Sequence, residues 1–218
     1  MFKDKSKKKF EIKRVFFISQ YFPPDYAPTG NLIEQLINSL NYREIIVYTG
    51  IPGYAKDNKE FESFQKKNNI SISRSSFSDI LPKKFQGRII NSFLFTLRTF
   101  FKLIINLKKE DLIILTSEPP FVPSLFWIVY LFKRNKFILI IFDIYPDLLC
   151  AIGLIRKRKI VYQIWKSLNR LSFHFTKEIV VLNKEMKNKI LNDYQISPDK
   201  INIIPPWVDS KQIKPIIN

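Results

Sequence analysis

The stretch VFFISQYFPPDYAPTGNLIEQLINSL, Val15–Leu40, contains a candidate strand, a stiff loop and a candidate helix in succession. Its first five residues are β-branched, aromatic or apolar almost throughout, as in a strand buried on both faces. Prolines then stiffen the loop, Thr29 is a candidate helix cap, and Gly30 allows a ligand to approach the positive end of the helix closely. A strand, a loop and a helix of this kind begin a βαβ unit. The helix has an apolar stripe formed by Leu32, Ile33, Leu36, Ile37 and Leu40.

The same alternation of short apolar runs and longer helical segments continues along the chain. It predicts an α/β fold, namely one domain with a doubly wound, mostly parallel Rossmann-like sheet and helices on both faces. The expected strands are Val15–Ser19, Glu44–Thr49, Ile70–Arg74, Leu112–Thr116, Phe137–Phe142, Glu178–Leu182 and Ile201–Ile204.

Two further helices are predicted from apolar residues that recur at helical spacing, and both stripes are expected to face the core. The first stripe contains Ile89, Ile90, Phe93, Leu94, Leu97, Phe100, Phe101, Ile104 and Ile105. The second contains Ile160, Val161, Ile164, Trp165, Leu168, Leu171 and Phe175.

The net charge of +17 favours phosphate-rich partners or an anionic membrane surface, although a skewed codon composition also produces such a charge. No nucleic-acid-reading motif accompanies it, so nucleic acid is not expected as a partner.

A single cysteine and a single histidine exclude a disulfide framework and argue against zinc; no metal or other cofactor is expected. The start of the chain lacks the apolar segment of a signal peptide, and the most apolar stretches are too short or interrupted by charge to span a membrane. We therefore expect a cytoplasmic protein. A peripheral location on the inner face of the plasma membrane is the second expectation.

The predicted helix around residue 95 suggests such a peripheral contact. Phe95, Arg98 and Lys102 fall on its polar side, and an aromatic ring among cations suits an interface with anionic headgroups. Arg156–Lys159 adds a second basic patch. The alternative is that these residues form an ordinary solvated face.

In a doubly wound sheet, ligands bind beyond the carboxyl ends of the strands, so the loops there are the candidate site. Each candidate in these loops also has a structural alternative, such as capping a helix or bracing a turn. The loops contain Thr29, Gly30 and Asn31 after the first strand, Ser117 and Glu118 after the fourth, Asp143 and Asp147 after the fifth, and Asn183 after the sixth.

The order of these loops resembles a known family. YFPPDYAPTGNLIEQLINSL, DLIILTSEPP, FILIIFDIYPDLL, EIVVLNKEMKNKIL and ISPDKINIIPPWVD together are similar to the amino-terminal half of a family 4 glycosyltransferase of the GT-B fold. The likeness is greatest to members that build bacterial capsule, exopolysaccharide or O-antigen chains, and it extends from Arg14 to Asp209.

The resemblance implies a role for each loop. Thr29, Gly30 and Asn31 correspond to the family's glycine loop, whose amides approach the donor phosphates, although the family often has two glycines there. Asp143 and Asp147 match the aspartates of its D-x-x-P-(D/E) segment and are the expected catalytic residues. Ser117, Glu118 and Asn183 are the expected acceptor-binding residues, the substrates are a nucleotide-sugar and a polysaccharide or lipid-linked acceptor, and transfer retains the anomeric configuration. Many relatives have a histidine where Phe142 stands, so no histidine role is carried over.

The family's second domain, which holds most of the donor, has no counterpart in the sequence. We divide the chain into a basic tail (1–13), a Rossmann-like domain (14–209) and the start of an interdomain linker (210–218). The expectation is an acceptor-binding domain that needs a separate donor-binding domain or subunit, since one side of a cleft forms only part of the donor contacts. A noncatalytic membrane-surface module and an inactive remnant are the alternatives.

Overall fold

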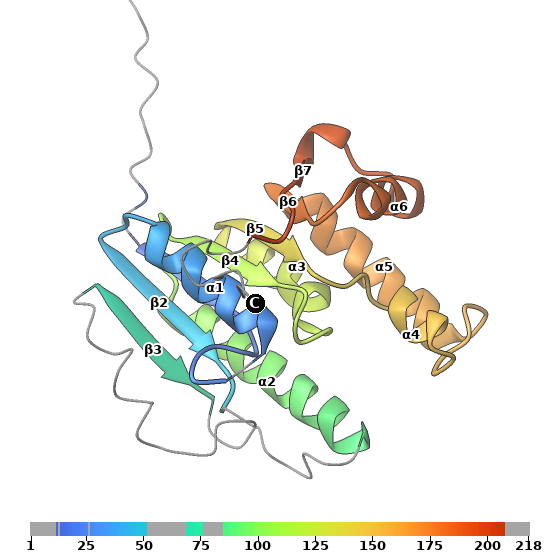
Figure 1. Ribbon diagram of the computed structural model, residues 1–218, viewed down its shortest axis with the longest axis horizontal. Helices are drawn as coiled ribbons and strands as arrows, with labels where there is room; N and C mark the ends of the chain where they lie inside the picture. The colour runs from blue at the N-terminus through green and yellow to red at the C-terminus, as the bar shows by residue number, and fades with distance from the viewer. Residues whose placement is uncertain (1–11, 13, 26, 52–68, 76–84, 208–218) are drawn as a thin grey trace, which may run out of the picture.

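The protein has a seven-stranded sheet in which every neighbouring pair of strands is parallel, in the order β3-β2-β1-β4-β5-β6-β7 (Figure 1). The computed structural model describes residues 12, 14–25, 27–51, 69–75 and 85–207. The predicted strands are confirmed, with some ends shifted by a residue. They are β1 Arg14–Ile18, β2 Glu44–Thr49, β3 Ile70–Arg74, β4 Leu112–Thr116, β5 Lys136–Ile141, β6 Glu178–Val181 and β7 Ile201–Ile203.

Helices cover both faces of the sheet, which confirms the predicted Rossmann-like α/β architecture. Alternate residues of β1 point to opposite faces: Val15 and Phe17 pack with Ile33 of α1, whereas Phe16 packs with Phe95 of α2. The helices are α1 Pro28–Ser39, α2 Phe85–Asn106, α3 Val122–Lys133, α4 Asp147–Ala151, α5 Ile160–Phe175 and α6 Lys184–Tyr194, with a 3-10 turn at Pro198–Lys200.

The strand order reverses between β1 and β4. From β1 the chain moves outward to β2 and β3, and it then returns through α2 to place β4 on the other side of β1. At such a reversal the connecting helices leave on opposite faces, and the loops beyond the strand ends form a crevice. The loops after β1 and β4 therefore border the crevice in which a fold of this kind binds its ligands.

The apolar stripes of α2 and α5 were predicted to face the core, but most of their residues are exposed or only partly buried. Phe101, Ile105 and Ile160 are 60%, 78% and 74% exposed. Trp165 of the second predicted stripe is buried, as expected. The rest of the inward side is rich in polar side chains, namely Asn91, Ser92, Thr96 and Thr99 of α2 and Asn169 and Ser172 of α5, together with aromatic Phe95, Tyr162 and Phe173.

Several of these buried polar groups have hydrogen-bond partners within the fold. The Thr96 hydroxyl donates to the Ser92 carbonyl at 2.7 Å, and Ser124 of α3 donates to the Asn169 side chain of α5 at 2.7 Å. A buried hydroxyl costs little when it has such a partner. Small hydroxyl residues therefore allow α2 and α5 to turn a mixed face inward, which apolar periodicity does not reveal.

The expected membrane-facing group also lies elsewhere. Phe95 is 1% exposed and belongs to the core, so the prediction that its ring faces a membrane is wrong. Arg98 and Lys102 turn toward the β2–β3 edge, where they line a cavity of about 330 Å³ with Tyr48 and Arg74. The Lys102 ammonium lies 4.5 Å from the centre of the Tyr48 ring and donates to the Ser73 hydroxyl.

Within the described residues, one helical segment is long enough and apolar enough to cross a membrane by length and composition alone. It is 89–106 of α2, contrary to the expectation that its charges rule it out. A third of this segment is buried, and α2 packs against α3 as part of the layer that covers the sheet.

Candidate functional site at the carboxyl ends of the strands

The loops after β1 and β4 contact each other where the strand order reverses. The Thr29 hydroxyl donates to Glu118 Oε2 at 2.9 Å, and the Gln20 amide donates to the Glu118 carbonyl at 3.2 Å. The peptide bonds before Pro24, Pro119 and Pro146 are cis, one in each of the loops after β1, β4 and β5. Two of the predicted site residues, which are 89 positions apart in the chain, are thus brought into direct contact.

Ser117 joins the β4 loop to the β5 loop. Its hydroxyl oxygen accepts from the amides of Phe142 at 3.0 Å and Asp143 at 3.2 Å, and its own amide donates to the Ile140 carbonyl at 2.9 Å. Ser117 is 4% exposed. In this arrangement Ser117 positions Asp143 next to Glu118, and its predicted contact with an acceptor stays a prediction.

The group formed by Glu118, Asp143 and Tyr145 is partly removed from water and has negative character. Burial raises the pKa of the Glu118 carboxyl, the hydrogen bond from Thr29 opposes this, and the charge of Asp143 adds to it. Burial also raises the pKa of Asp143. Burial, with the charges of Asp143, Glu118 and Tyr21, raises the pKa of Tyr145 to about 12. A carboxyl with a raised pKa is suited to accept a proton from a hydroxyl.

The start of α1 differs from the expectation for Thr29. The helix begins at Pro28 with Ala27 as its N-terminal cap residue, so Thr29 lies in the first turn and does not cap it. Proline has no amide hydrogen, and the amides of Gly30 and Asn31 donate to the Ala27 carbonyl at 2.9 Å and 3.3 Å. The Thr29 amide lies in the same turn, at the positive end of the helix, and its predicted contact with a donor phosphate stays a prediction.

Gly30 has a packing role as well. A Cβ atom at this position would lie 3.3 Å from backbone atoms of Tyr21 and Phe22. Glycine thus lets the first turn of α1 pack directly on the loop after β1, which brings Thr29 within reach of Glu118.

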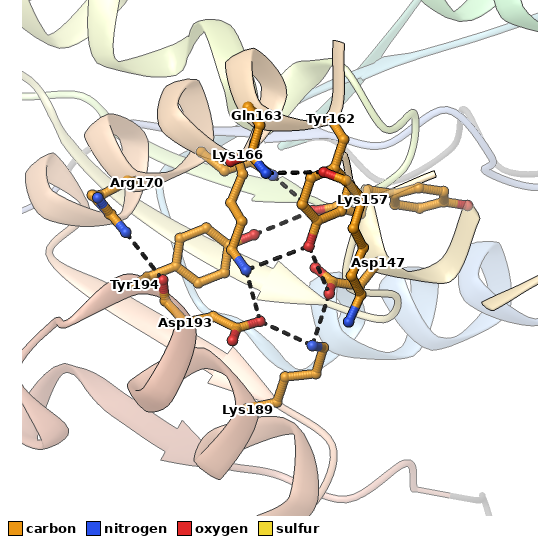
Figure 2. A network of polar contacts seen from close by, with 11 residues as sticks. Asp147, Lys157, Tyr162, Gln163, Lys166, Arg170, Lys189, Asp193 and Tyr194 are labelled. Atoms are coloured by element: carbon orange, nitrogen blue, oxygen red, sulfur yellow. Dashed lines mark hydrogen bonds and ion pairs between the residues drawn. The ribbon is translucent and has the colours of Figure 1, made fainter. Parts of the chain in front are cut away.

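Asp147 lies apart from this group, in an ion-pair network that joins α4, α5 and α6 (Figure 2). Its Oδ1 is 2.8 Å from the Lys189 ammonium and accepts from the Tyr162 hydroxyl at 3.1 Å. Asp193 accepts from Lys189 at 2.9 Å and is 3.2 Å from the Lys166 ammonium. The Asp147 side chain is 8% exposed. These contacts favour a structural role for Asp147, and its predicted catalytic role stays a prediction.

The titration behaviour of the network reflects this pairing. Burial alone would lower the pKa of Lys189, but the hydrogen bonds and charges of Asp147 and Asp193 outweigh burial and raise it. For Asp193, burial is likewise outweighed by Lys189 and Lys166, which lower its pKa. Both shifts favour the charged forms of Lys189 and Asp193, as expected for groups that stabilise an ion pair.

Asn183 caps α6, as one of the two sequence interpretations expects. Its side-chain oxygen accepts from the Met186 amide at 2.8 Å. The amide oxygen can accept a second hydrogen bond and the side-chain NH2 can donate, so the predicted acceptor contact of Asn183 stays a prediction.

Tyr145 is the site residue that the sequence reasoning missed. Its carbonyl accepts from the Asn169 side chain at 2.8 Å, and its ring lies parallel to that of Trp165 with 6.2 Å between centroids. The signal was its place between the two aspartates, directly before Pro146. Within the described ranges, no group of three or more His, Cys, Asp or Glu side chains is arranged to hold a metal ion.

Comparison with known proteins supports a relation to glycosyltransferases. No family model matches the chain. A protein of Pseudomonas aeruginosa described as probable glycosyltransferase WbjE is 21% identical over 213 residues, which cover 94% of this chain and 50% of that protein. The chain therefore spans about half the length of the curated relative that it matches, and it is glycosyltransferase-like over that half.

Two solved structures share the fold. UGT2 of Phytolacca americana, complexed with UDP-2-fluoro-glucose and pterostilbene, aligns with a TM-score of 0.55 at 11% identity, covering 92% of this chain and 55% of that one. The N-terminal domain of trehalose-6-phosphate phosphatase of Candida albicans aligns with a TM-score of 0.60 at 11% identity, covering 94% and 51%. At these identities the likeness concerns the Rossmann-like fold alone.

Proposed function

We propose that this chain is the acceptor-binding domain of a retaining family 4-type glycosyltransferase of the GT-B fold. In this role it holds a polysaccharide or lipid-linked acceptor beside the nucleotide-sugar. A domain outside these 218 residues, on the same polypeptide or another one, then holds most of the donor. No metal or other cofactor is required by the proposal.

The observation that carries the proposal is the contact between Thr29 and Glu118 at the strand reversal, with Asp143 held beside it by Ser117. A doubly wound sheet binds its ligands at this place. Carboxylates there accept hydrogen bonds from sugar hydroxyls, which are donors as well as acceptors.

Each residue then has a defined part. The raised pKa of Asp143 suits it to orient an acceptor hydroxyl or accept its proton. Glu118, fixed by Thr29, binds a neighbouring hydroxyl of the acceptor. The first turn of α1 lies at the positive end of its helix dipole, which favours the charge that develops on the departing diphosphate.

The proposal is tested by sugar transfer in a reconstituted system. The purified chain is combined with a donor-binding domain, for which the downstream reading frame is the first candidate, and a panel of UDP- and GDP-sugars is assayed for release of the nucleoside diphosphate. We expect release only when both parts and an acceptor-containing membrane fraction are present, and its loss on Asp143→Asn. Robust transfer by this chain alone would contradict the need for a second domain, and transfer that is unchanged by Asp143→Asn and by Glu118→Gln would contradict the site.

A further inference from the structure

The helices α2, α3 and α5 expose many large apolar side chains. Of the sixteen large apolar side chains exposed among the described residues, eleven belong to these three helices. Several are almost fully exposed, including Ile105 at 78%, Ile160 at 74% and Phe132 at 73%. We call this set the outer face: Ile89, Ile90, Phe93, Phe101, Ile105, Leu131, Phe132, Ile160, Val161, Ile164 and Leu171.

The three helices form one layer on a single face of the sheet. Core residues of α2, α3 and α5 belong to the same apolar cluster, and α3 contacts both of its neighbours. Aromatic contacts also link the helices, because Phe121, just before α3, lies 6.2 Å from Phe93 of α2 and stacks at 4.7 Å on Trp165 of α5. With their inner sides against the sheet, the exposed apolar residues of this layer point away from it. The outer face is therefore distinct from the site at the strand ends.

The charged side chains of this layer are all basic. The segments 85–109, 119–142 and 148–177, which contain α2, α3 and α5, have no aspartate or glutamate, although the whole chain has 19. Exposed basic residues border the outer face, namely Lys108 and Lys109 after α2, Arg134 after α3, and Arg156, Lys157, Arg158 and Lys159 directly before α5. An apolar surface bordered by cations and free of acids complements one that has an apolar interior and anionic headgroups.

We propose that the outer face binds the surface of an anionic lipid bilayer. Its aliphatic and aromatic side chains enter the boundary between headgroups and acyl chains, and the basic residues beside them contact lipid phosphates. A second copy of the chain fits this face less well, because pairing would bring two cationic surfaces together with no acid in the three segments to offset them. The site at the strand ends is left open in this orientation.

Vesicle sedimentation of the full chain tests the proposal without any assay of transfer. At a salt concentration of about 0.05 M we expect binding to vesicles of phosphatidylcholine mixed with phosphatidylglycerol, and weaker binding to phosphatidylcholine alone; about 0.5 M salt should lower binding about tenfold. The combined change Phe101→Ser, Ile105→Ser and Ile160→Ser should lower binding about tenfold or more. Arg156→Gln with Arg158→Gln should lower only the binding to anionic vesicles, also about tenfold.

Matched controls separate this surface from general loss of apolar or basic groups. Ile203→Ser with Ile204→Ser removes exposed apolar residues outside the layer, and Arg43→Gln with Lys184→Gln removes two exposed charges outside it. Both controls should bind vesicles as the original chain does, and thermal unfolding should show all variants folded. Absence of binding to anionic vesicles, or equal binding by the outer-face variant and its control, would overturn the proposal. So would dimerisation in size exclusion that the outer-face variant abolishes while vesicle binding stays unchanged.

Discussion

Asp143 and Asp147 follow the same strand, but their surroundings are opposite. Asp143 lies in the loop beside Glu118 and Tyr145, where burial raises its pKa and the neighbouring groups are acids. Asp147 is the first residue of α4 and is held between the Lys189 ammonium and the Tyr162 hydroxyl. Four residues thus separate a carboxyl that is suited to exchange a proton from one that is paired with side chains of α5 and α6.

The largest expected effect concerns Asp143. Asp143→Asn should lower sugar transfer by the reconstituted enzyme about 100-fold or more, because the group that orients or deprotonates the acceptor is lost. The midpoint of thermal unfolding should not fall, since a carboxyl whose burial opposes ionisation is replaced by a neutral amide. Asp147→Asn, in contrast, should lower the midpoint and leave transfer by the folded enzyme within severalfold. If Asp147→Asn abolished transfer and Asp143→Asn only lowered the unfolding midpoint, the roles given to the two aspartates would be reversed.

The next effect is on stability and concerns Lys189. Lys189→Met leaves the carboxylate of Asp147 buried without its ion-pair partner, and we expect a loss of about 2 kcal/mol in the free energy of unfolding, less than for a fully buried pair because the lysine side chain is 38% exposed. Urea unfolding measures the change. Combining Lys189→Met with Asp147→Asn should recover part of it, and Lys184→Met, at an exposed position of α6, serves as the control. A loss no larger than that of the control would show that the network does not stabilise the fold.

The third prediction distinguishes two roles of Asn183, namely capping α6 and contacting the acceptor. Asn183→Ala removes the hydrogen bond to the Met186 amide and should cost about 1 kcal/mol of stability, whereas Asn183→Asp should retain most of it. Transfer by both variants should stay within severalfold of the original. A loss of transfer by Asn183→Asp with stability intact would instead support the predicted acceptor contact.

The smallest effect is a pH dependence at Glu118. The pKa of Glu118 is higher in the folded than in the unfolded protein, so ionisation of this carboxyl lowers the stability of the fold. The loss is absent below the unfolded pKa and develops as pH rises through the folded pKa. Glu118→Gln keeps an oxygen for Thr29 and removes the charge, so it should stabilise the fold at pH 8 by about 0.5 kcal/mol and leave stability near pH 4 unchanged. Thermal unfolding at both pH values measures the difference. A destabilisation that is larger at pH 8 than near pH 4 would show that the charged form is the favoured one.

Much of the fold was predictable because its strands are nearly continuous apolar runs. A run such as Leu112–Thr116 is buried along its whole length, so its composition alone distinguishes it from an exposed segment. The helices were less predictable. Phe95 looks polar-facing beside Arg98 and Lys102, yet it is buried on a side of α2 that also contains polar Thr96, whose hydroxyl bonds to a carbonyl of the same helix.

The candidate site was predictable as a set of loops but not as a set of contacts. Strand ends identify Glu118 and Asp143, since parallel strands present their carboxyl ends at one edge. The hydrogen bond from Thr29 to Glu118 depends on strand order, which joins residues far apart in the sequence. The division between Asp143 and Asp147 depends on Lys189, which lies on a helix that no local pattern connects to them.

The Ser117 hydroxyl has a mechanical consequence. Because one oxygen accepts from the amides of Phe142 and Asp143, and Glu118 is the next residue in the chain, the backbone segments that carry the two carboxyls are tied together. A ligand that displaced the backbone of one loop would therefore strain the hydrogen bonds that position the other, whereas rotation of either side chain would leave these bonds intact.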